Sequence, residues 1–540
     1  MKRFFSLFLV LVFIFMLSSC SDKSTGKSVT YSIGNSPATL DPQFASDTAA
    51  QVVINNTFEG LVRLDKDGKV IPGIAEEWSI SADGLTYAFK LKEGTEWYCP
   101  AVLKKEYGDE FYEKFSTAKV TAEDFVFACR RAITLREGTT HAHRLFVIEN
   151  APQVYSGALP VEKLGVSAPD ANTLVIKLNA PCSDFLERLT ECEFMPCNAD
   201  FFEAMGGRYG ISNKHIMCNG PFYITAWDPE TSITAKANKF YAGEQTVVPS
   251  SVIFTFDDDP GSVASKVSSA ALLAGILPPD IEMPEDTHFV KENRNGIFGF
   301  CFNCSDELLR NVNLRLALCC SIDRNIFSPV NDNTKPQFGF IPESCSVGSE
   351  SYAQAAKGQT PIISYSEAMA SGFFNASLEE LEKSKVNLTV ICPEWLETQV
   401  RQQLQVWQRV LGINIGLVVN AMPVEEINKA LSAGEYQIAL AGIASEYETA
   451  VDYVKSFRNG GFFRFDTAEY GVIVDKLMNT ENETELVEGC FTAENFILQQ
   501  GICFPVYSRA SSFIVSDEAD EIYMPGGPST VTFIAAKRFD

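Results

Sequence analysis

Hydrophobic and polar positions change their period several times in the last third of the chain. Apolar side chains first alternate, then recur every three or four positions, and then alternate again. Alternation predicts a strand, and the longer period predicts a helix with one apolar face. The pattern predicts a strand at 388–392, a helix at 396–411 that stops at Gly412, a strand at 413–419, a helix at 424–432 and a strand at 436–442. This order is typical of an α/β layer with a parallel sheet.

The carboxyl end of the last predicted strand is the first place to look for a binding site. Ligands of open parallel sheets bind beyond the carboxyl ends of the strands. Ser445, Glu446 and Tyr447 follow the strand that ends near Gly442. We therefore expect these residues, together with Gly442 and Ile443, to contact a ligand.

The first third of the chain has a different organisation. Short alternating segments at 87–91, 164–168 and 173–178 predict strands, and Asp-Gly pairs at 67–68 and 83–84 predict turns. Thr121 precedes an acidic first turn, which is typical of a helix N-cap. This region is predicted to be α+β. Together with the α/β layer of the last third, it makes the chain as a whole one of mixed α/β class.

The N-terminus has the pattern of an export signal. Lys2 and Arg3 precede an uncharged stretch from Phe4 to Met16, which is shorter than a membrane-spanning helix. Leu17-Ser-Ser-Cys20 follows and resembles the bacterial lipobox, which implies that Cys20 is acylated and becomes the new N-terminus. A plain signal or an uncleaved anchor is the alternative. Residues 1–19 are then a signal peptide and 20–28 a polar tether, and no later segment is apolar and long enough to span a bilayer.

Charge and cysteine usage exclude several classes of function. The net charge of −25 argues against nucleic-acid binding, which needs a basic surface, and is sufficiently explained by a soluble acidic exterior. Cys301-x-x-Cys304 and Cys319-Cys320 look like metal or redox motifs, but the four histidines are scattered. We interpret the cysteines mainly as small buried hydrophobic residues and expect neither a metal nor a cofactor. The sequence contains no Gly-x-Ser-x-Gly elbow and no His-Glu-x-x-His motif, which argues against a hydrolase.

A series of short motifs over the whole body resembles one family. They are Leu40-Asp-Pro42, Phe58-Glu-Gly-Leu61, Pro72-Gly-Ile-Ala75 with Trp78, Asp83-Gly84, Phe89-Lys-Leu91, Thr121-Ala-Glu-Asp-Phe125, Asn219-Gly-Pro-Phe222, Asn238 with Tyr241, Phe302-Asn303, Ile322-Asp-Arg324, and Trp407 with Leu411-Gly-Ile413. In this order they resemble the extracytoplasmic solute-binding proteins of peptide-type ABC importers, family 5.

The resemblance implies a bilobal periplasmic-binding-protein-like fold with an additional inserted domain. We expect lobe I at 29–57, 181–285 and 500–540, the inserted α+β domain at 58–180, and lobe II at 286–499. The implied function is that of a monomeric, non-enzymatic receptor, which captures a peptide and delivers it to a membrane permease. Another solute, such as an oligosaccharide, an opine or a metal chelate, is the alternative, and an exported hydrolase is a weaker one.

Three departures from the family pattern bear on the site. The chain has an insertion at 98–119, and Ile276-Leu-Pro-Pro-Asp280 replaces a Gly-Glu-x-Asp element. At 442–447 it reads Gly-Ile-Ala-Ser-Glu-Tyr, where the family commonly has Gly-Trp-x-x-Asp-Tyr. The resemblance implies that Glu446 takes the amino group of the ligand. Ile443 in place of tryptophan removes an aromatic wall, so we expect a pocket of different shape.

Overall fold

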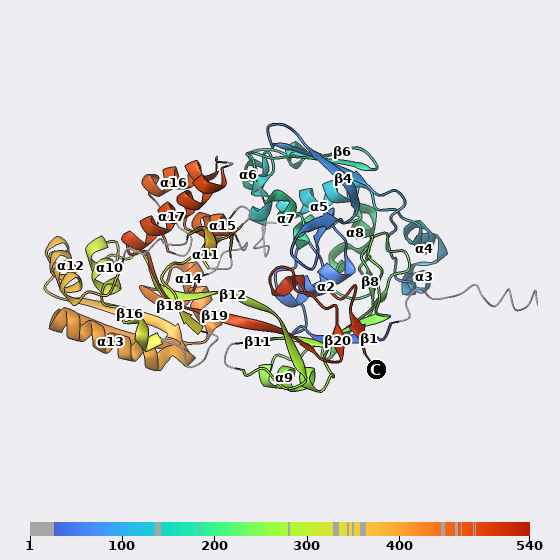
Figure 1. Ribbon diagram of the computed structural model, residues 1–540. Helices are drawn as coiled ribbons and strands as arrows, with labels where there is room; N and C mark the ends of the chain where they lie inside the picture. The colour runs from blue at the N-terminus through green and yellow to red at the C-terminus, as the bar shows by residue number, and fades with distance from the viewer. Residues whose placement is uncertain are drawn as a thin grey trace, which may run out of the picture. The chain divides into compact units, whose positions relative to one another are not determined.

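The chain folds into two units (Figure 1). The computed structural model describes residues 26–134, 142–182, 184–278, 281–327, 334–342, 345–347, 350–356, 363–443, 449–458, 463–465, 467–478, 480 and 482–539. The first unit contains the chain up to Gly275, Met283–Phe289 and Ile514–Asp540; the second contains Ile276–Glu282 and Val290–Phe513. Two strands, β12 (Thr287–Phe302) and β19 (Cys503–Ser516), run from one unit into the other.

The first unit contains one part of an 11-stranded sheet and a separate four-stranded sheet. In the former, β1 lies parallel to β10, and β8, β9 and β10 are joined as antiparallel neighbours. Its strands are β11 (Ala274–Leu277), β1 (Ser28–Ser32), β10 (Ser251–Thr255), β9 (Ser232–Ala237) and β8 (Phe222–Asp228). The other sheet is antiparallel and consists of β4 (Ala75–Ile80), β5 (Thr86–Leu91), β7 (Thr173–Lys177) and β6 (Val166–Asp170). The division of this half into lobe I and an inserted 58–180 domain stays a prediction.

Short helices and two-stranded ribbons complete the first unit. The helices are α2 (Thr48–Thr57), α3 (Val102–Tyr107), α4 (Asp109–Ser116), α5 (Ala122–Thr134), α6 (Ala151–Ser156), α7 (Phe185–Arg188), α8 (Ala199–Met205) and α9 (Pro260–Ser268). The ribbons pair β2 (Val62–Leu64) with β3 (Val70–Pro72) and β20 (Ala519–Asp520) with β21 (Lys537–Arg538). The insertion at 98–119 forms α3 and α4, and Phe115 of α4 packs edge-on against Phe201 of α8. The insertion is therefore part of the folded body.

The second unit is built on the other part of the 11-stranded sheet, with strand order β17-β16-β18-β12-β19. The first three strands, β17 (Ile415–Met422), β16 (Val386–Pro393) and β18 (Ile438–Ile443), are parallel, and β12 is antiparallel to β18. The smaller strands are β13 (Thr334–Pro336), β14 (Ser346–Val347) and β15 (Glu350–Ser351). The helices are α10 (Val312–Cys319), α11 (Tyr352–Ala355), α12 (Glu367–Glu380), α13 (Glu397–Leu411), α14 (Val424–Ala433), α15 (Ala450–Ser456), α16 (Ala468–Met478) and α17 (Glu483–Gln499).

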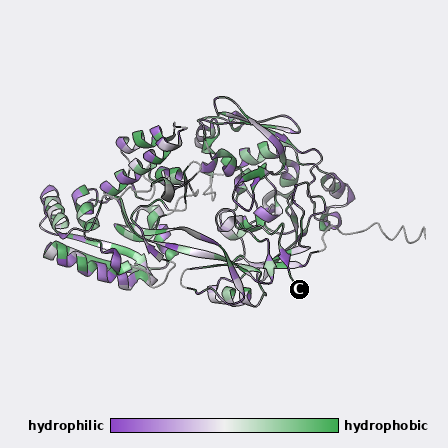
Figure 2. Cartoon of the chain, in the orientation of Figure 1, coloured by the Kyte–Doolittle hydropathy of each residue, from purple (hydrophilic) through white to green (hydrophobic). Residues whose placement is uncertain are grey.

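Helices cover both faces of this sheet and enclose two hydrophobic clusters. On one face Phe300 and Leu440 pack with buried residues of α10, α12 and α13. On the other face Ile297 and Ala439 pack with buried residues of α14, α15, α16 and α17. Figure 1 shows α13 along one side of the sheet, and in Figure 2 the strands are largely green while the helices also carry purple segments. The second unit is thus a three-layer α/β structure, and the predicted mixed α/β class is confirmed.

The predicted elements of the second unit agree with the structure except at one turn. The strand at 388–392, both helices and the last strand correspond to β16, α13, α14 and β18. Gly412 ends α13 with φ at 81°, a conformation that glycine adopts without strain. The prediction was wrong at Ile413, because a short 3-10 turn over Gly412–Asn414 delays the strand to Ile415 and leaves Ile413 92% exposed.

The cysteines and the helices of the described part agree with what the sequence predicts for disulfides and membrane spans. The fourteen cysteines there form no disulfide with one another, and all but Cys304 are buried. Their interpretation as small hydrophobic residues is therefore confirmed. Within the same residues no helix has both the length and the hydrophobicity to cross a bilayer.

Candidate ligand-binding site

The carboxyl ends of three parallel strands meet at one edge of the second unit's sheet. In register, Pro393 of β16 lies beside Met422 of β17, and Val390 lies beside Ile438 of β18. Because the three strands are parallel, the segments that follow them leave the sheet at the same edge. These segments are the turn at 394–396 and Pro423, and β18 itself ends at this edge with Ile443. This edge is where the sequence predicts a ligand.

Three aromatic side chains and one arginine gather at this edge; we call them the aromatic cluster. The rings of Phe298 and Trp395 are 5.6 Å apart with their planes at 74°, and those of Phe298 and Tyr507 are 5.3 Å apart and parallel within 2°. The guanidinium carbon of Arg509 lies 4.5 Å from the centroid of the Trp395 ring. Edge-to-face, stacked and cation–π contacts of this kind hold aromatic rings in a fixed arrangement.

Local structure explains why these residues come together. Phe298 on β12 is the register partner of Gly442 on β18, and β19, which carries Tyr507 and Arg509, is the next strand after β12. Trp395 sits in the turn directly after Pro393 and stays 47% exposed. A methyl group built on Gly442 would meet no atom of the described residues within 4 Å, so these residues leave the space beside Phe298 open. The cluster thus borders free space with a half-exposed tryptophan ring.

Tyr507 is the most buried member of the cluster. Its side chain is only slightly exposed, and burial raises the pKa of its hydroxyl. Within the described residues that hydroxyl has no hydrogen-bond partner. Buried polar groups are normally paired, so Tyr507 leaves a donor that a bound molecule or a water can satisfy.

The predicted site residues fall into two groups. Ser445, Glu446 and Tyr447 lie outside the described residues, between Ile443 and Thr449, whose side chain caps α15. Gly442 is exposed. Ile443 is 2% exposed and belongs to the cluster of buried residues on the opposite face of the sheet from Phe298 and Gly442. Its side chain therefore fills the core.

The sequence interpretation missed all four members of the aromatic cluster. Phe298 and Tyr507 occur in apolar alternating segments that are typical of core strands, and only the pairing of distant strands brings them together. Trp395 carries the one available signal: a large aromatic residue directly after a strand that ends in proline, at the edge where ligands bind.

Comparisons with known proteins identify the family. The family model of bacterial extracellular solute-binding proteins, family 5 (middle), matches residues 69–463. The chain belongs to this family. The oligopeptide-binding protein OppA of Bacillus subtilis is 24% identical over 552 residues, covering 97% of each chain. The probable deoxycholate-binding periplasmic protein YgiS of Escherichia coli is 24% identical over 505 residues, covering 88% of this chain and 87% of YgiS.

Solved structures of the family share the fold. Listeria monocytogenes OppA bound to peptide superposes with a TM-score of 0.74 at 22% identity, covering 96% of this chain and 100% of that one. The substrate-binding domain of the oligopeptide ABC transporter from Bacillus anthracis gives a TM-score of 0.76 at 23% identity, covering 96% and 99%. The predicted family and the bilobal periplasmic-binding-protein-like fold are both confirmed.

In the first unit the family motifs hold the fold together. Asp41 of the Leu-Asp-Pro motif forms a buried two-fold ion pair with Arg131 of α5. The side chain of Asn219 in Asn-Gly-Pro bridges the backbone of Glu59 in Glu-Gly-Leu: it donates to the Glu59 carbonyl oxygen at 2.9 Å and accepts from the Glu59 N–H at 3.1 Å. These motifs therefore mark packing contacts of the family fold.

The Thr-Ala-Glu-Asp motif is a helix cap. The carboxylate of Asp124 accepts hydrogen bonds from the Thr121 N–H at 2.8 Å and from the Trp97 indole at 3.3 Å. Burial raises the pKa of Asp124 to about 6, against these hydrogen bonds, which lower it. The predicted N-terminus of this helix is confirmed, with the acidic third residue reaching back to the cap.

In the second unit, too, the side chains of the family motifs make hydrogen bonds inside the fold. Arg324 of Ile-Asp-Arg donates to the carbonyl oxygens of Gln337 and Pro505, and Trp407 donates to that of Leu318 at 3.0 Å. Pro505 precedes Tyr507 by two residues on β19, so Arg324 helps to fix the strand that carries two members of the aromatic cluster. No group of three or more histidine, cysteine or acidic residues in the described part is placed to hold a metal ion.

Proposed function

We propose that this chain is the extracytoplasmic receptor of an ABC importer and that it captures peptides at the strand-end edge of its second unit. The family assignment supports the receptor role, and the names of several relatives, including the oligopeptide-binding protein OppA of Bacillus subtilis, support peptides as the solute. The observation that carries the proposal is the aromatic cluster beside the open space at Gly442.

The chemistry of this edge suits a peptide. The half-exposed ring of Trp395 offers an apolar surface on which a side chain of a peptide can pack, whatever its sequence. Glu446, in the segment that follows Gly442 and Ile443, supplies a carboxylate for the free amino group. An ammonium that meets a carboxylate away from water forms a charge-assisted hydrogen bond worth roughly 1.5–3 kcal/mol. Ser445 and Tyr447 flank Glu446 and complete the proposed contact segment.

A non-peptide solute is the second candidate. Ile443, at the position where the family commonly has tryptophan, is buried in the core, so the aromatic surface of this edge comes from Trp395 and Phe298 instead. A relative of similar identity is named a probable deoxycholate-binding protein. Oligosaccharides, opines and metal chelates are further members of this class, and sugar rings also pack on tryptophan.

The chain's place in the cell is part of the proposal. A lipid on Cys20 holds the mature protein at the outer side of the cytoplasmic membrane, and the tether at 20–28 links it to the folded body. The receptor acts as a monomer, without a cofactor, and passes the intact solute to the permease. Intact peptides recovered after incubation with the pure protein support a receptor, whereas cleaved peptides mean a hydrolase.

Glu446→Gln tests the proposed amine contact, because it keeps the shape of the side chain and removes its charge. Calorimetric titration with a short peptide should show a loss of about ten- to a hundredfold in affinity. Glu448→Gln, two residues further along the same segment, is the matched control and should bind as the wild type does. Equal affinity in all three proteins would refute the amine contact.

A further inference from the structure

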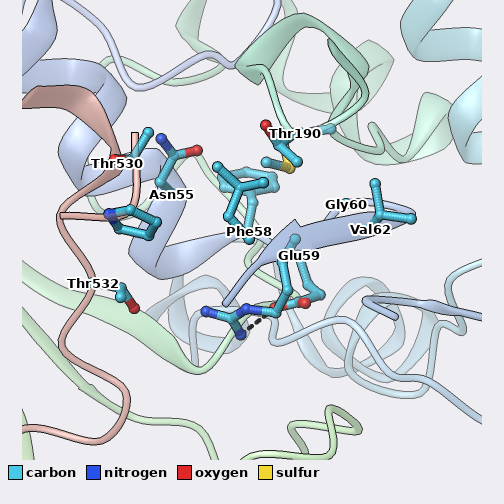
Figure 3. A pocket seen from close by; sticks show the side chains of 12 residues that line it. Asn55, Phe58, Glu59, Gly60, Val62, Thr190, Thr530 and Thr532 are labelled. Atoms are coloured by element: carbon cyan, nitrogen blue, oxygen red, sulfur yellow. Dashed lines mark hydrogen bonds and ion pairs between the residues drawn. The ribbon is translucent and has the colours of Figure 1, made fainter. Parts of the chain in front are cut away.

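A cavity in the first unit is formed by three separate segments of the chain (Figure 3). Its empty space amounts to about 490 Å3, which includes the part open to solvent. Its walls come from the end of α2 and the turn after it, from β2, from the segment around 190–195, and from the C-terminal segment at 525–532. All of these residues belong to the first unit, so the cavity is separate from the aromatic cluster.

A charged pair lines the cavity. The Nη1 of Arg63 donates to the Glu59 carboxylate at 3.3 Å, drawn as a dashed line in Figure 3, and to the Tyr241 hydroxyl at 2.8 Å. The Tyr241 hydroxyl donates in turn to the same carboxylate oxygen at 2.9 Å. The Arg63 side chain is 13% exposed and the Glu59 side chain 5%. The guanidinium is thus held in one orientation by the buried Glu59 and the half-buried Tyr241.

This arrangement uses only one nitrogen of the guanidinium. Among the described residues, no hydrogen bond is formed by the Nη2 of Arg63, and its buried Nε has no partner either. The carboxylate of Glu59 meets the guanidinium at Nη1 and leaves the Nη2 side to another acceptor. Guanidinium groups present their N–H donors as a planar fork that matches a carboxylate.

The rest of the lining is mainly apolar. Phe58, Val62, Leu64, Met195 and Pro525 supply hydrophobic surface. The hydroxyls of Thr190 and Thr530 already donate to backbone carbonyl oxygens, of Glu187 and Gly527 respectively. Two further polar atoms of lining residues, Glu59 Oε1 and the Thr532 hydroxyl, are buried without a hydrogen-bond partner among the described residues, and Glu59 Oε1 lies beside Gly73. A molecule that fits this lining has a compact, largely apolar body and one anionic group for Arg63.

We propose that this cavity binds a small apolar monocarboxylate, with Arg63 holding the carboxylate through its free edge. Glu59 and Tyr241 position the guanidinium and do not contact the ligand. The site goes beyond the proposed receptor function, since it lies in the first unit and takes a different class of molecule. It gives the receptor a second ligand whose binding is independent of the captured solute.

Fluorine NMR of the full-length mature protein tests the site with 4-fluorobenzoate as the probe. Its neutral analogue 4-fluorobenzamide has nearly the same shape and lacks the charge. The wild type should bind 4-fluorobenzoate with a dissociation constant of about 1 mM or tighter, and the benzamide at least about tenfold more weakly. Arg63→Met should weaken 4-fluorobenzoate binding at least about tenfold. Arg208→Met, which removes a more exposed arginine of the same unit outside the cavity lining, should leave it unchanged.

Two results would overturn the proposal. One is equal binding of the acid and the amide, which would mean that no anion is recognised. The other is no binding of either compound to the folded wild type at millimolar concentration, which would mean that the cavity holds only water. Arg63→Met leaves the buried carboxylate of Glu59 without its cation, and a loss of binding in this variant can therefore also result from misfolding. A second variant, which keeps the charged pair, separates the two causes. Leu64→Trp keeps the charged pair and fills the cavity, and it should also abolish binding; undiminished binding in Leu64→Trp would refute the location.

Discussion

Replacing Trp395 with alanine should weaken solute binding about tenfold. The side chain is 47% exposed, which is roughly 120 Å2 of a tryptophan's roughly 250 Å2. A ligand that covers half of this surface buries about 60 Å2, and at about 25 cal/mol per Å2 this contributes about 1.5 kcal/mol. A difference of about 1.4 kcal/mol is tenfold in the dissociation constant.

Isothermal titration calorimetry with a peptide that binds the wild type measures this loss. Trp395→Phe keeps an aromatic face and should recover most of the affinity. Met369→Ala removes a side chain of similar exposure, 52%, from α12 of the same unit and should have no effect. Thermal melting should show that all three variants fold, because Trp395 is only half buried.

An affinity within twofold of the wild type in folded Trp395→Ala would refute this reasoning. The solute would then not lie on the tryptophan ring, and the open space beside Gly442 would serve no binding role. A loss of affinity in Met369→Ala as large as that in Trp395→Ala would refute it too, since binding would then respond to any truncation of this unit's surface.

Three further predictions concern the fold and the membrane anchor. Arg131→Met leaves Asp41 as an uncompensated buried charge and should lower the free energy of unfolding by about 3–5 kcal/mol in urea; a loss below about 1 kcal/mol would contradict the role of this ion pair. Burial raises the pKa of Glu494 from 4.5 to about 7. Its contribution to the free energy of unfolding, about 3 kcal/mol, is therefore fully present below pH 4.5 and is lost as the pH rises through 7. Glu494→Gln should remove this part of the pH dependence of the free energy of unfolding, and an unchanged pH dependence would contradict the prediction. Cys20→Ala should release the protein into the medium or leave it unprocessed, and a membrane-bound product of normal mature size would disprove the lipid anchor.

Elements defined by local periodicity could be predicted from the sequence. The helix at 397–411 follows from apolar residues spaced three and four apart and from the glycine that ends it. The error at Ile413 has a physical cause, since an alternating pattern does not reveal that the first residue after a helix belongs to the turn. Such ends depend on backbone geometry more than on hydrophobicity.

The candidate site could be predicted only in part. Its location at the strand ends follows from the α/β pattern, because parallel strands place their carboxyl ends together. Its composition does not, because Phe298 and Tyr507 come from strands separated by about two hundred residues of chain. The family motifs at Asp41 and Asn219 do not mark the strand-end edge either, because both residues make contacts inside the first unit.

Native mass spectrometry of the mature protein, incubated with a mixed peptide pool, tests the central claim most directly. The wild type should carry one intact peptide per molecule. Gly442→Trp, which fills the open space beside Phe298, should carry far less while remaining folded. A wild type that binds no peptide, cleaves the pool, or binds peptides no better than Gly442→Trp would contradict the account.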